Sequence, residues 1–205
     1  TFTDLAGGHH HTCALDALGS ITCWGQDNHN QISDKPADGT YIDIIAGSWH
    51  TCVRDASGSL TCWGGDDDNQ ISNTPGGTFT DVTAGGNHTC ALDESGSITC
   101  WGRNNYNQVS DAPTSGTFID LAGGWGHNCA LDASGYITCW GIDDYNHPAV
   151  SDTPGGTFID IDSGGNHTCA LDALGSITCW GTDNFNQISH APTSGTFTDV
   201  VGGDA

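Results

Sequence analysis

The 205-residue sequence has no methionine, only three lysine and arginine residues together, and a single glutamate, Glu94, among its 25 acidic residues. These residue types are strong helix formers, so their scarcity argues against a helical fold. The formal net charge of −22 excludes nucleic acid and anionic lipid as partners, because like charges repel. No apolar run is long enough to cross a bilayer as a helix. The composition therefore predicts an all-β protein without membrane insertion.

One segment, "HTCALDALGSITCWG" in its first copy, occurs five times with little change. The copies occupy residues 11–25, 50–64, 88–102, 127–141 and 167–181. They begin 38 to 40 residues apart, a period typical of propellers and solenoids. A unit of this size cannot bury its own apolar surface, so each one must stack on its neighbours. We therefore expect a single repeat domain over residues 1–205.

The two cysteines of each copy lie on opposite arms of a predicted hairpin. In the first copy, the loop at residues 17–19 ends in Gly19, as does a type I turn followed by a left-handed residue. This turn places Cys13 opposite Cys23 at a non-hydrogen-bonded site, where Cα atoms approach to about 4.5 Å, within reach of a disulfide. The predicted disulfides are Cys13–Cys23, Cys52–Cys62, Cys90–Cys100, Cys129–Cys139 and Cys169–Cys179.

Metal binding by these cysteines is the weaker alternative. The sequence has no C-x-x-C pair, and directly opposed thiols do not form a tetrahedral site. Disulfides in every repeat require an oxidising environment, which predicts an extracellular or cell-surface protein.

Each hairpin follows a predicted strand that ends in a glycine loop, such as "TFTDLAGG" at residues 1–8. A polar loop and a brief apolar stretch, such as "QDNHNQIS" at residues 26–33, follow the hairpin and predict a short edge strand. Four of these loops have an asparagine suited to a left-handed turn: Asn30, Asn69, Asn107 and Asn186. Three to four short strands per repeat match the size of a propeller blade. The predicted fold class is an all-β propeller of five repeats, each with one intra-blade disulfide.

The order "AGG-x-HTCALD-x-G-x-ITCWG-x-N-x-x-N-Q-I" resembles the regulator of chromosome condensation repeat, in its cysteine-bearing extracellular microbial form. The resemblance covers nearly the whole chain and implies a β-propeller. It implies no single function, because the family includes nucleotide-exchange factors, photoreceptors, enzyme inhibitors and surface proteins. The chain departs from the family in having Asn-Gln-Ile-Ser where Gly-Gln-Leu-Gly is usual, and five repeats where familiar members close with seven blades. Its disulfides and acidity argue against the nuclear exchange role.

A histidine lies two positions before the first cysteine of each copy: His11, His50, His88, His127 and His167. The resemblance favours hydrogen bonds from these imidazoles to neighbouring strands over a metal-binding ring. No Ser-His-Asp order, paired glutamates or phosphate-binding glycine loop stands out, which predicts that the protein is not an enzyme.

Three further sets of residues are candidate ligand sites. Trp49 and Trp125 interrupt the glycine loops, where they would contact a sugar ring or a partner side chain, or else pack on the next blade. The "NHT" sequons at Asn87 and Asn166 are candidate glycosylation sites. Clustered loop carboxylates are a candidate calcium site, with solvated turns as the alternative: Asp66, Asp67, Asp68, Asp143 and Asp144. No other cofactor is predicted.

The strand that opens each repeat occurs six times, although there are only five hairpins. The sixth copy, "TFTDVVGG" at residues 196–203, nearly duplicates residues 1–8. One explanation is that the ends lie loosely on the propeller or that the sequence is part of a longer array of repeats. The other is that the extra strand pairs with another copy of the chain, a strong contact that forms filaments when used head to tail. The candidate assembly residues are Thr196, Phe197, Thr198, Asp199, Val200 and Val201 at one end and Phe2, Thr3, Asp4 and Leu5 at the other.

The sequence thus predicts a non-catalytic extracellular scaffold, a filament or surface-layer subunit that associates with itself through terminal strand pairing. The alternative is a monomeric secreted propeller that binds a protein or glycan partner on one face, as an inhibitor or an adhesin does.

Overall fold

The computed structural model of the chain describes residues 1–143 and 148–203. In that part, five antiparallel sheets contain three strands each, and the strands of a sheet are consecutive in the sequence. The strands are β1 (Phe2–Gly7), β2 (His11–Asp16), β3 (Ile21–Gly25), β4 (Tyr41–Ala46), β5 (His50–Asp55), β6 (Leu60–Gly64), β7 (Phe79–Ala84), β8 (His88–Asp93), β9 (Ile98–Gly102), β10 (Phe118–Gly123), β11 (His127–Asp132), β12 (Ile137–Gly141), β13 (Asp160–Ser163), β14 (His167–Leu171) and β15 (Ile177–Gly181). None of the described segments is a helix long and apolar enough to cross a membrane.

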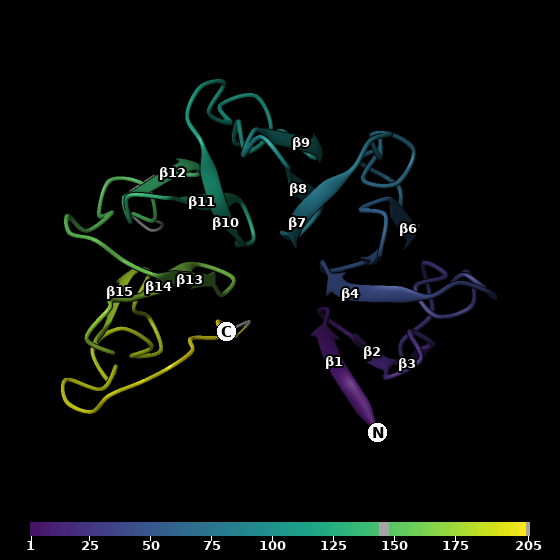
Figure 1. Ribbon diagram of the computed structural model, residues 1–205, viewed down its shortest axis with the longest axis horizontal. Helices are drawn as coiled ribbons and strands as arrows, with labels where there is room; N and C mark the ends of the chain where they lie inside the picture. The colour runs from purple at the N-terminus through teal and green to yellow at the C-terminus, as the bar shows by residue number, and fades with distance from the viewer. Residues whose placement is uncertain (144–147, 204–205) are drawn as a thin grey trace.

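The five sheets are the blades of a propeller and stand around a common axis (Figure 1). In each blade the first strand lies nearest the axis, the second in the middle and the third at the periphery. The predicted all-β propeller of five repeats is therefore confirmed. The predicted edge strand is wrong: residues 31–34 form turns. The Asp27 carboxylate accepts hydrogen bonds from the N–H groups of Ile32 and Ser33, which folds this stretch back as a loop.

The hairpins have the predicted register, with Cys13 opposite Cys23 and Leu15 opposite Ile21. The third loop residue is a left-handed glycine in every blade, with φ between 75° and 87°. All five predicted disulfides are present, and their Cα atoms lie 4.0–4.1 Å apart. The four asparagines predicted to be left-handed have φ between 58° and 62°. Local turn chemistry therefore determines the shape of each hairpin.

The first strand of four blades carries a β-bulge between its aromatic residue and its aspartate. A bulge breaks the regular alternation of side chains and re-aims the residue beside it. The Asp81 carboxylate consequently reaches the next blade, where it accepts a hydrogen bond from the N–H of Leu121 at 3.1 Å. Asp120 bonds the N–H of Ile161 in the same way at 3.3 Å. The repeated "TFTD" motif thus connects blades as well as starting a strand.

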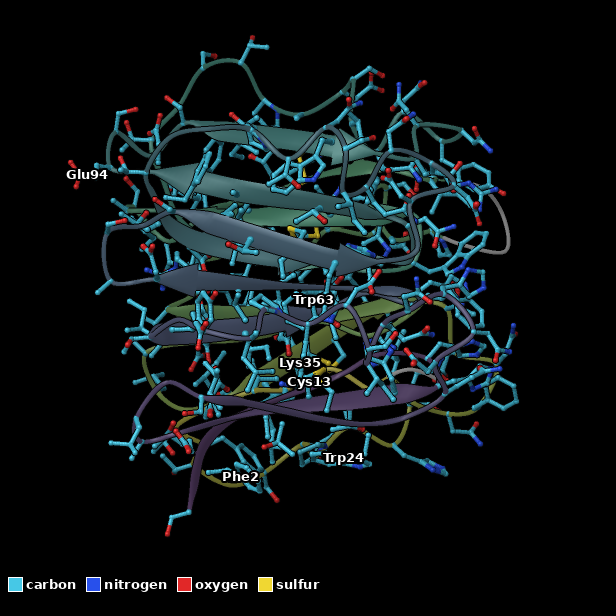
Figure 2. All side chains as sticks on the ribbon, turned by 90° about the vertical axis from the view of Figure 1, so that its right-hand side faces the viewer. Phe2, Cys13, Trp24, Lys35, Trp63 and Glu94 are labelled. Carbon is cyan, nitrogen blue, oxygen red and sulfur yellow. A yellow bond between two sulfur atoms is a disulfide. The ribbon has the colours of Figure 1, made fainter. Side chains whose placement is uncertain are left out.

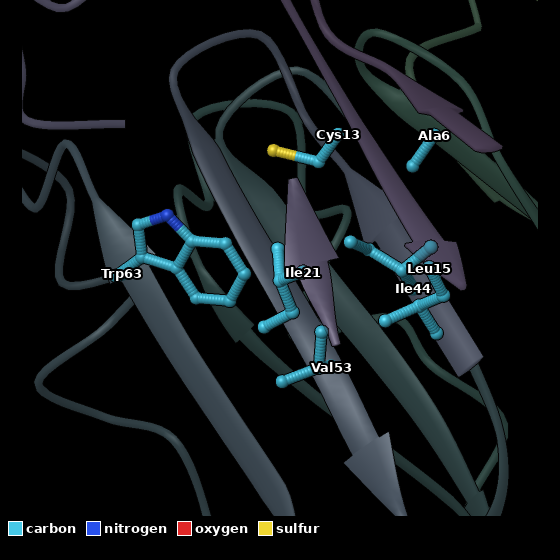
Figure 3. Packing of buried hydrophobic residues seen from close by; sticks show 7 residues of the cluster. All are labelled: Ala6, Cys13, Leu15, Ile21, Ile44, Val53 and Trp63. Atoms are coloured by element: carbon cyan, nitrogen blue, oxygen red, sulfur yellow. The ribbon is translucent and has the colours of Figure 1, made fainter. Parts of the chain in front are cut away.

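The apolar cores lie between blades. Leu15 and Ile21 of the first blade pack against Ile44, Val53 and Trp63 of the second (Figure 3). Corresponding clusters occupy the later junctions. A blade therefore buries its apolar side chains only where it has a neighbour, as expected for a protein built from stacked repeats.

The described blades form an open arc, with the two chain ends at the sides of the opening (Figure 1). First strands of consecutive blades contact one another from β1 through β13, but β13 and β1 make no comparable contact. A side chain added at Gly123 would meet Thr83 and Ala84 of the preceding blade, whereas one added at Gly7, the same position in the first blade, would meet nothing within 4 Å. The first blade thus has no predecessor in the described chain.

Removing one hairpin disulfide tests how much each blade depends on its covalent bond. Closing a loop of about ten residues contributes on the order of 3 kcal/mol in the chain-entropy account. We expect Cys90→Ala/Cys100→Ala to lower the free energy of unfolding by about that amount in urea titrations. The control is Thr99→Ala, because Thr99 is exposed on the same strand. Equal stability of the two variants would show that junctions alone stabilise the blade.

Candidate functional site

In the second to fifth blades, a buried indole on the third strand joins the blade to the one before it. Trp63 donates its Nε1–H to the carbonyl of Gln31 at 2.9 Å. The later blades repeat this 2.9 Å bond with Trp101 and Gln70, Trp140 and Gln108, and Trp180 and Ala149. The glutamine side chain shapes the acceptor loop, since Gln31 Oε1 accepts a hydrogen bond from the N–H of His29. The four donating indoles are only 4% exposed, so each bond satisfies a buried donor and a buried acceptor.

A second hydrogen bond joins the same junction from the opposite blade. His50 Nε2 lies 2.8 Å from the hydroxyl oxygen of Thr89 in the next blade. The other such pairs are His11 with Thr51, His88 with Asn128 and His127 with Thr168. Burial lowers the pKa of His50 to about 3 and that of His88 to about 4, so the imidazoles of His50 and His88 are neutral near pH 7. The expected role of the repeated histidine is confirmed for these four.

The first blade exposes the face that every later blade buries. Trp24, the counterpart of the four buried indoles, is 46% exposed. Phe2 and Leu5 are 50% and 62% exposed, whereas their counterparts in the third blade, Phe79 and Val82, are buried. Figure 2 shows Phe2 and Trp24 together at one edge of the molecule, with Trp63 inside it. The predicted assembly residues of β1 therefore lie on an open face.

At the other end, residues 196–203 do not form the expected strand. They lie along the fifth blade, where the first strand of a sixth blade would be. The N–H of Phe197 donates to the carbonyl of Gly175, and that of Gly202 donates to the Asp162 carboxylate at 2.8 Å. No middle strand follows this segment in the described chain, so its outer edge has no ladder partner. The predicted assembly residues of the C-terminal segment thus lie at the second open face.

The polar loop of the fifth blade, residues 183–188, corresponds to the loops whose glutamine carbonyls accept the indole hydrogen bonds. In the described chain no later blade brings an indole to it. Gln187 folds as its counterparts do, with Oε1 accepting a hydrogen bond from the N–H of Phe185. Gln31 and Gln70 are buried beneath the following blade, whereas Gln187 is partly exposed and Phe185 is 73% exposed. Sequence reasoning named the terminal strands but missed Trp24 and Gln187, because these two residues match their counterparts in the other repeats and differ only in lacking a neighbouring blade.

The glycine loops surround a central pocket of about 320 Å³ at one end of the propeller axis, together with Gly202 and Gly203. Trp125 lines this pocket and is 41% exposed. The Arg103 guanidinium lies 5.6 Å from the Trp125 ring, and the Tyr106 ring lies 5.6 Å from it. This cluster of one cation and two aromatic rings suits a planar or ring-shaped ligand group.

Trp49 lies in a different setting. It is half-buried, and the rings of His9, His10 and His29 lie 5.6, 5.4 and 4.9 Å from it. Trp49 and His29 belong to consecutive blades, as do Trp125 and Tyr106, so both tryptophans pack on the blade before them as well as facing solvent. The structure supports Trp125 better than Trp49 as a candidate contact for a ligand.

The loop aspartates bind their own backbone. Asp66 accepts hydrogen bonds from the N–H groups of Ile71 and Ser72, and Asp143 accepts from that of Ser151. Asp67 is exposed, and Asp144 lies outside the described residues. Within residues 1–143 and 148–203, no three His, Cys, Asp or Glu side chains are grouped to hold a metal ion. Calcium binding stays a prediction.

The two sequons also stay a prediction. Asn87 and Asn166 are both half-buried beside the glycine loops. The Asn87 amide donates to the carboxylate of Asp68 in the preceding blade at 3.0 Å, so an attached glycan would have to replace this contact.

The bulge aspartates form a partly buried row along the inner strands. Burial, with the neighbouring Asp43 charge adding to it, raises the pKa of Asp81 to about 6. Burial and the Asp81 charge raise the pKa of Asp120 to about 7. Asp43 is paired with Arg54 at 3.0 Å. The inner strands therefore hold carboxyl groups that carry less charge than the composition implies.

Three-stranded blades around an axis, with hydrogen bonds and cores at every junction, define a β-propeller repeat protein. The chain belongs to the regulator of chromosome condensation (RCC1) repeat family, whose model matches residues 2–31, 41–70, 79–108, 118–146 and 158–187, one segment per blade. No curated protein matches the sequence with significance.

Solved structures with the same fold include two plant receptor ectodomains. The ectodomain of the Physcomitrella patens receptor kinase CR4 is 27% identical, with a TM-score of 0.73 over 88% of this chain and 50% of that one. The CRINKLY WD40 ectodomain of the Arabidopsis thaliana receptor kinase ACR4 is 25% identical, with a TM-score of 0.78 over 100% of this chain and 73% of that one. Prp20p from Saccharomyces cerevisiae shares the fold at 19% identity, with a TM-score of 0.73 over 88% of this chain and 58% of that one. The chain thus spans half to three quarters of these relatives.

Matched tryptophan variants test the junction bond. Trp63→Phe leaves the buried Gln31 carbonyl without its donor, so we expect it to lower the free energy of unfolding by about 1–3 kcal/mol. Trp24→Phe removes a donor that is exposed, and its effect should stay within about 0.5 kcal/mol. Urea titrations of dilute protein make the comparison. Equal losses in the two variants would contradict the junction account.

The buried aspartates and histidines should oppose each other as pH changes. As pH falls from 7 to 4, Asp81 and Asp120 take up protons in the folded state while the same groups stay ionised in the unfolded state, so these two residues raise the stability. Over much of the same range, His50 and His88 stay neutral in the folded state and take up protons only on unfolding. These two residues therefore lower the stability as pH falls. We expect nearly constant stability there and a loss below pH 4. Below that pH Asp81 and Asp120 add no further stability, while His50 and the carboxyls of Asp16 and Asp27, whose pKa values are lowered in the folded state, still bind protons more readily in the unfolded chain.

The variant Asp120→Asn isolates one side of this balance. It removes a group that favours folding as pH falls, so its stability should decline from pH 7 to pH 4 where the wild-type protein stays level. Thermal melts across pH 8 to 3 at constant ionic strength provide the measurement. Parallel pH profiles for variant and wild type would contradict the assignment.

Proposed function

We propose that the chain is a non-catalytic extracellular scaffold protein that associates with copies of itself through its terminal strands. The observation that carries this proposal is the exposure, at both ends of the arc, of surfaces that every internal blade buries. Five disulfides support an oxidising compartment, and two receptor-kinase ectodomains with this fold support an extracellular one. Exposed apolar edges of this kind mark interaction sites.

The positions of the side chains that could take part in catalysis support a non-catalytic role. The imidazoles of His11, His50, His88 and His127 are engaged in the junctions. The central pocket is lined mostly by glycine backbone, which offers little that could act as a nucleophile or a general acid. Imidazoles that hydrogen-bond one blade to the next hold the fold together, which suits a structural protein.

A second candidate function is binding of a protein or glycan partner by a monomeric propeller. The specific observation is that Trp125, which lines the central pocket, is also in contact with the Tyr106 ring and the Arg103 guanidinium. An exposed indole stacks on the apolar face of a sugar ring or on a partner side chain, and an arginine beside it donates to hydroxyl or carboxylate groups.

Sedimentation velocity and electron microscopy over a range of concentrations separate the two functions. We expect species larger than one chain that grow with concentration and with added sodium chloride, because salt screens the repulsion between bodies of net charge −22. Trp125→Ala should leave this association unchanged. A strictly monomeric chain whose retention on glycan or protein arrays depends on Trp125 would overturn self-association and favour the second function.

A further inference from the structure

We infer that Trp125, Tyr106 and Arg103 form a binding site for a neutral sugar residue of a glycan. This inference rests on the second candidate function, whose ligand it names, and it does not depend on self-association. Arg103 and Tyr106 follow the last strand of the third blade, and Trp125 precedes the middle strand of the fourth. The site therefore lies across an internal junction, away from both ends of the described chain.

The three groups lie at nearly equal distances from one another. The ring centroids of Tyr106 and Trp125 are 5.6 Å apart, and the two ring planes are tilted by 48°. The Arg103 guanidinium carbon lies 5.6 Å from the Trp125 centroid and 6.0 Å from the Tyr106 centroid. Trp125 is 41% exposed and Tyr106 36%, so a ligand in solution can reach both rings.

Asn105 holds the guanidinium beside the rings. With its amide oriented to satisfy its hydrogen bonds, Asn105 Oδ1 accepts from Nε–H and Nη2–H of Arg103, both at 3.1 Å. A guanidinium has five N–H donors, so three remain for a ligand. Among the described residues no carboxylate pairs with Arg103, whereas Arg54 is paired with Asp43.

The fold does not require an indole at position 125. The second and third blades have Ser48 and Gly86 at the corresponding place, and the contact made there is one of the backbone. The N–H of Trp125 donates to the carbonyl of Gly165 at 2.7 Å, as that of Ser48 does to the carbonyl of Gly86 at 2.9 Å. A serine therefore forms the junction contact as an indole residue does.

Arg103 and Tyr106 also serve the fold through their backbone. The N–H of Arg103 donates to the carbonyl of Asn87 at 2.8 Å, and that of Thr182, its counterpart in the fifth blade, donates to the carbonyl of Asn166 at 2.8 Å. The N–H of Tyr106 donates to the loop glutamine, as do its counterparts with quite different side chains. The needs of the repeat thus do not explain why these three side chains occur together.

The chemistry of the cluster favours an uncharged ring that carries hydroxyl groups. An aromatic ring offers an apolar face on which the C–H groups of a pyranose pack. The guanidinium donates hydrogen bonds and accepts none, which suits hydroxyl oxygens. Its positive charge disfavours a cationic ligand, and the net charge of −22 disfavours an anionic one. A neutral sugar meets all of these conditions.

The adjoining central pocket indicates a ligand longer than one sugar. Trp125 lines this pocket of about 320 Å³, together with glycine backbone and the residues Ser48 and Ser163. Backbone groups and serine hydroxyls are suitable hydrogen-bond partners for sugar hydroxyls. We therefore expect an oligosaccharide, with one residue on Trp125 and the next in the pocket, to bind more tightly than a monosaccharide.

A glycan array followed by titration tests this inference. The array carries oligosaccharides of neutral hexoses and N-acetylhexosamines, and the same chains ending in a uronic or sialic acid. We expect the whole protein to be retained on neutral glycans and less on their acidic counterparts. Isothermal titration calorimetry then compares the best-retained neutral oligosaccharide with its terminal monosaccharide, and the oligosaccharide should have the lower dissociation constant.

Variants that introduce the residues of other repeats separate binding from folding. Trp125→Ser introduces the residue of the second blade and should raise the dissociation constant at least about tenfold, because it removes the stacking ring. Arg103→Thr introduces the residue of the fifth blade and should raise it about fivefold through lost hydrogen bonds. Trp49→Ala is the matched control, since Trp49 lies in a glycine loop but does not line the central pocket, and its affinity should equal that of the wild type. Far-ultraviolet circular dichroism and melting temperatures show whether each variant folds.

Three results would overturn the inference. Retention on acidic glycans alone, or on no glycan of the array, contradicts a site for a neutral sugar. A dissociation constant that Trp125→Ser leaves unchanged in a folded variant contradicts the assigned residues. Retention on a protein array alone would leave the second candidate function standing without a sugar ligand. Sedimentation velocity of the same preparations measures self-association separately, so a failure of sugar binding does not bear on the scaffold function.

Discussion

Each junction between blades depends on an indole N–H that crosses to a carbonyl oxygen in the preceding blade, with an imidazole crossing in the other sense. The blades have no cores of their own, because side chains such as Leu15 and Val53 are buried only against each other. A junction therefore has to supply apolar contact and polar satisfaction together, and Trp63 supplies both, with its ring in the core and its N–H on Gln31. The disulfide hairpins keep each small blade ready for that contact by restricting its unfolded state.

The direction of these bonds gives the arc two chemically different ends. Donor indoles face the preceding blade throughout, so the first blade ends in a donor and the fifth in an acceptor. The donor at one end of the arc and the acceptor at the other can form this junction bond only if the arc closes or a further blade covers them. Trp24 and Gln187 are ordinary members of their repeats, and their exposure follows only from where the described arc stops.

The unusual acidity is accommodated by the same geometry. Many aspartates lie in or beside turns. Carboxylates such as those of Asp16 and Asp27 accept hydrogen bonds there from backbone N–H groups, which holds the pKa of each below its ordinary value. The bulges place Asp81 and Asp120 differently, against the next blade and out of water, and there the pKa of each rises. Identical residue types thus serve as turn caps at the surface and as weakly acidic hydrogen-bond acceptors near the axis.

The sequence by itself determined the blade. Gly19 requires a left-handed turn, that turn fixes the register, and the register places Cys13 opposite Cys23; each step is local and follows from backbone sterics. The period then implied stacking, and the number of short strands per repeat implied a propeller. What only the tertiary structure decided is how many neighbours each blade has. Residues 1–8 and 196–203 are nearly the same peptide, yet one is a strand and the other is not, because only the first is followed by a hairpin that pairs with it. Trp24 and Trp63 likewise cannot be told apart in the sequence, because burial is a property of the neighbouring blade.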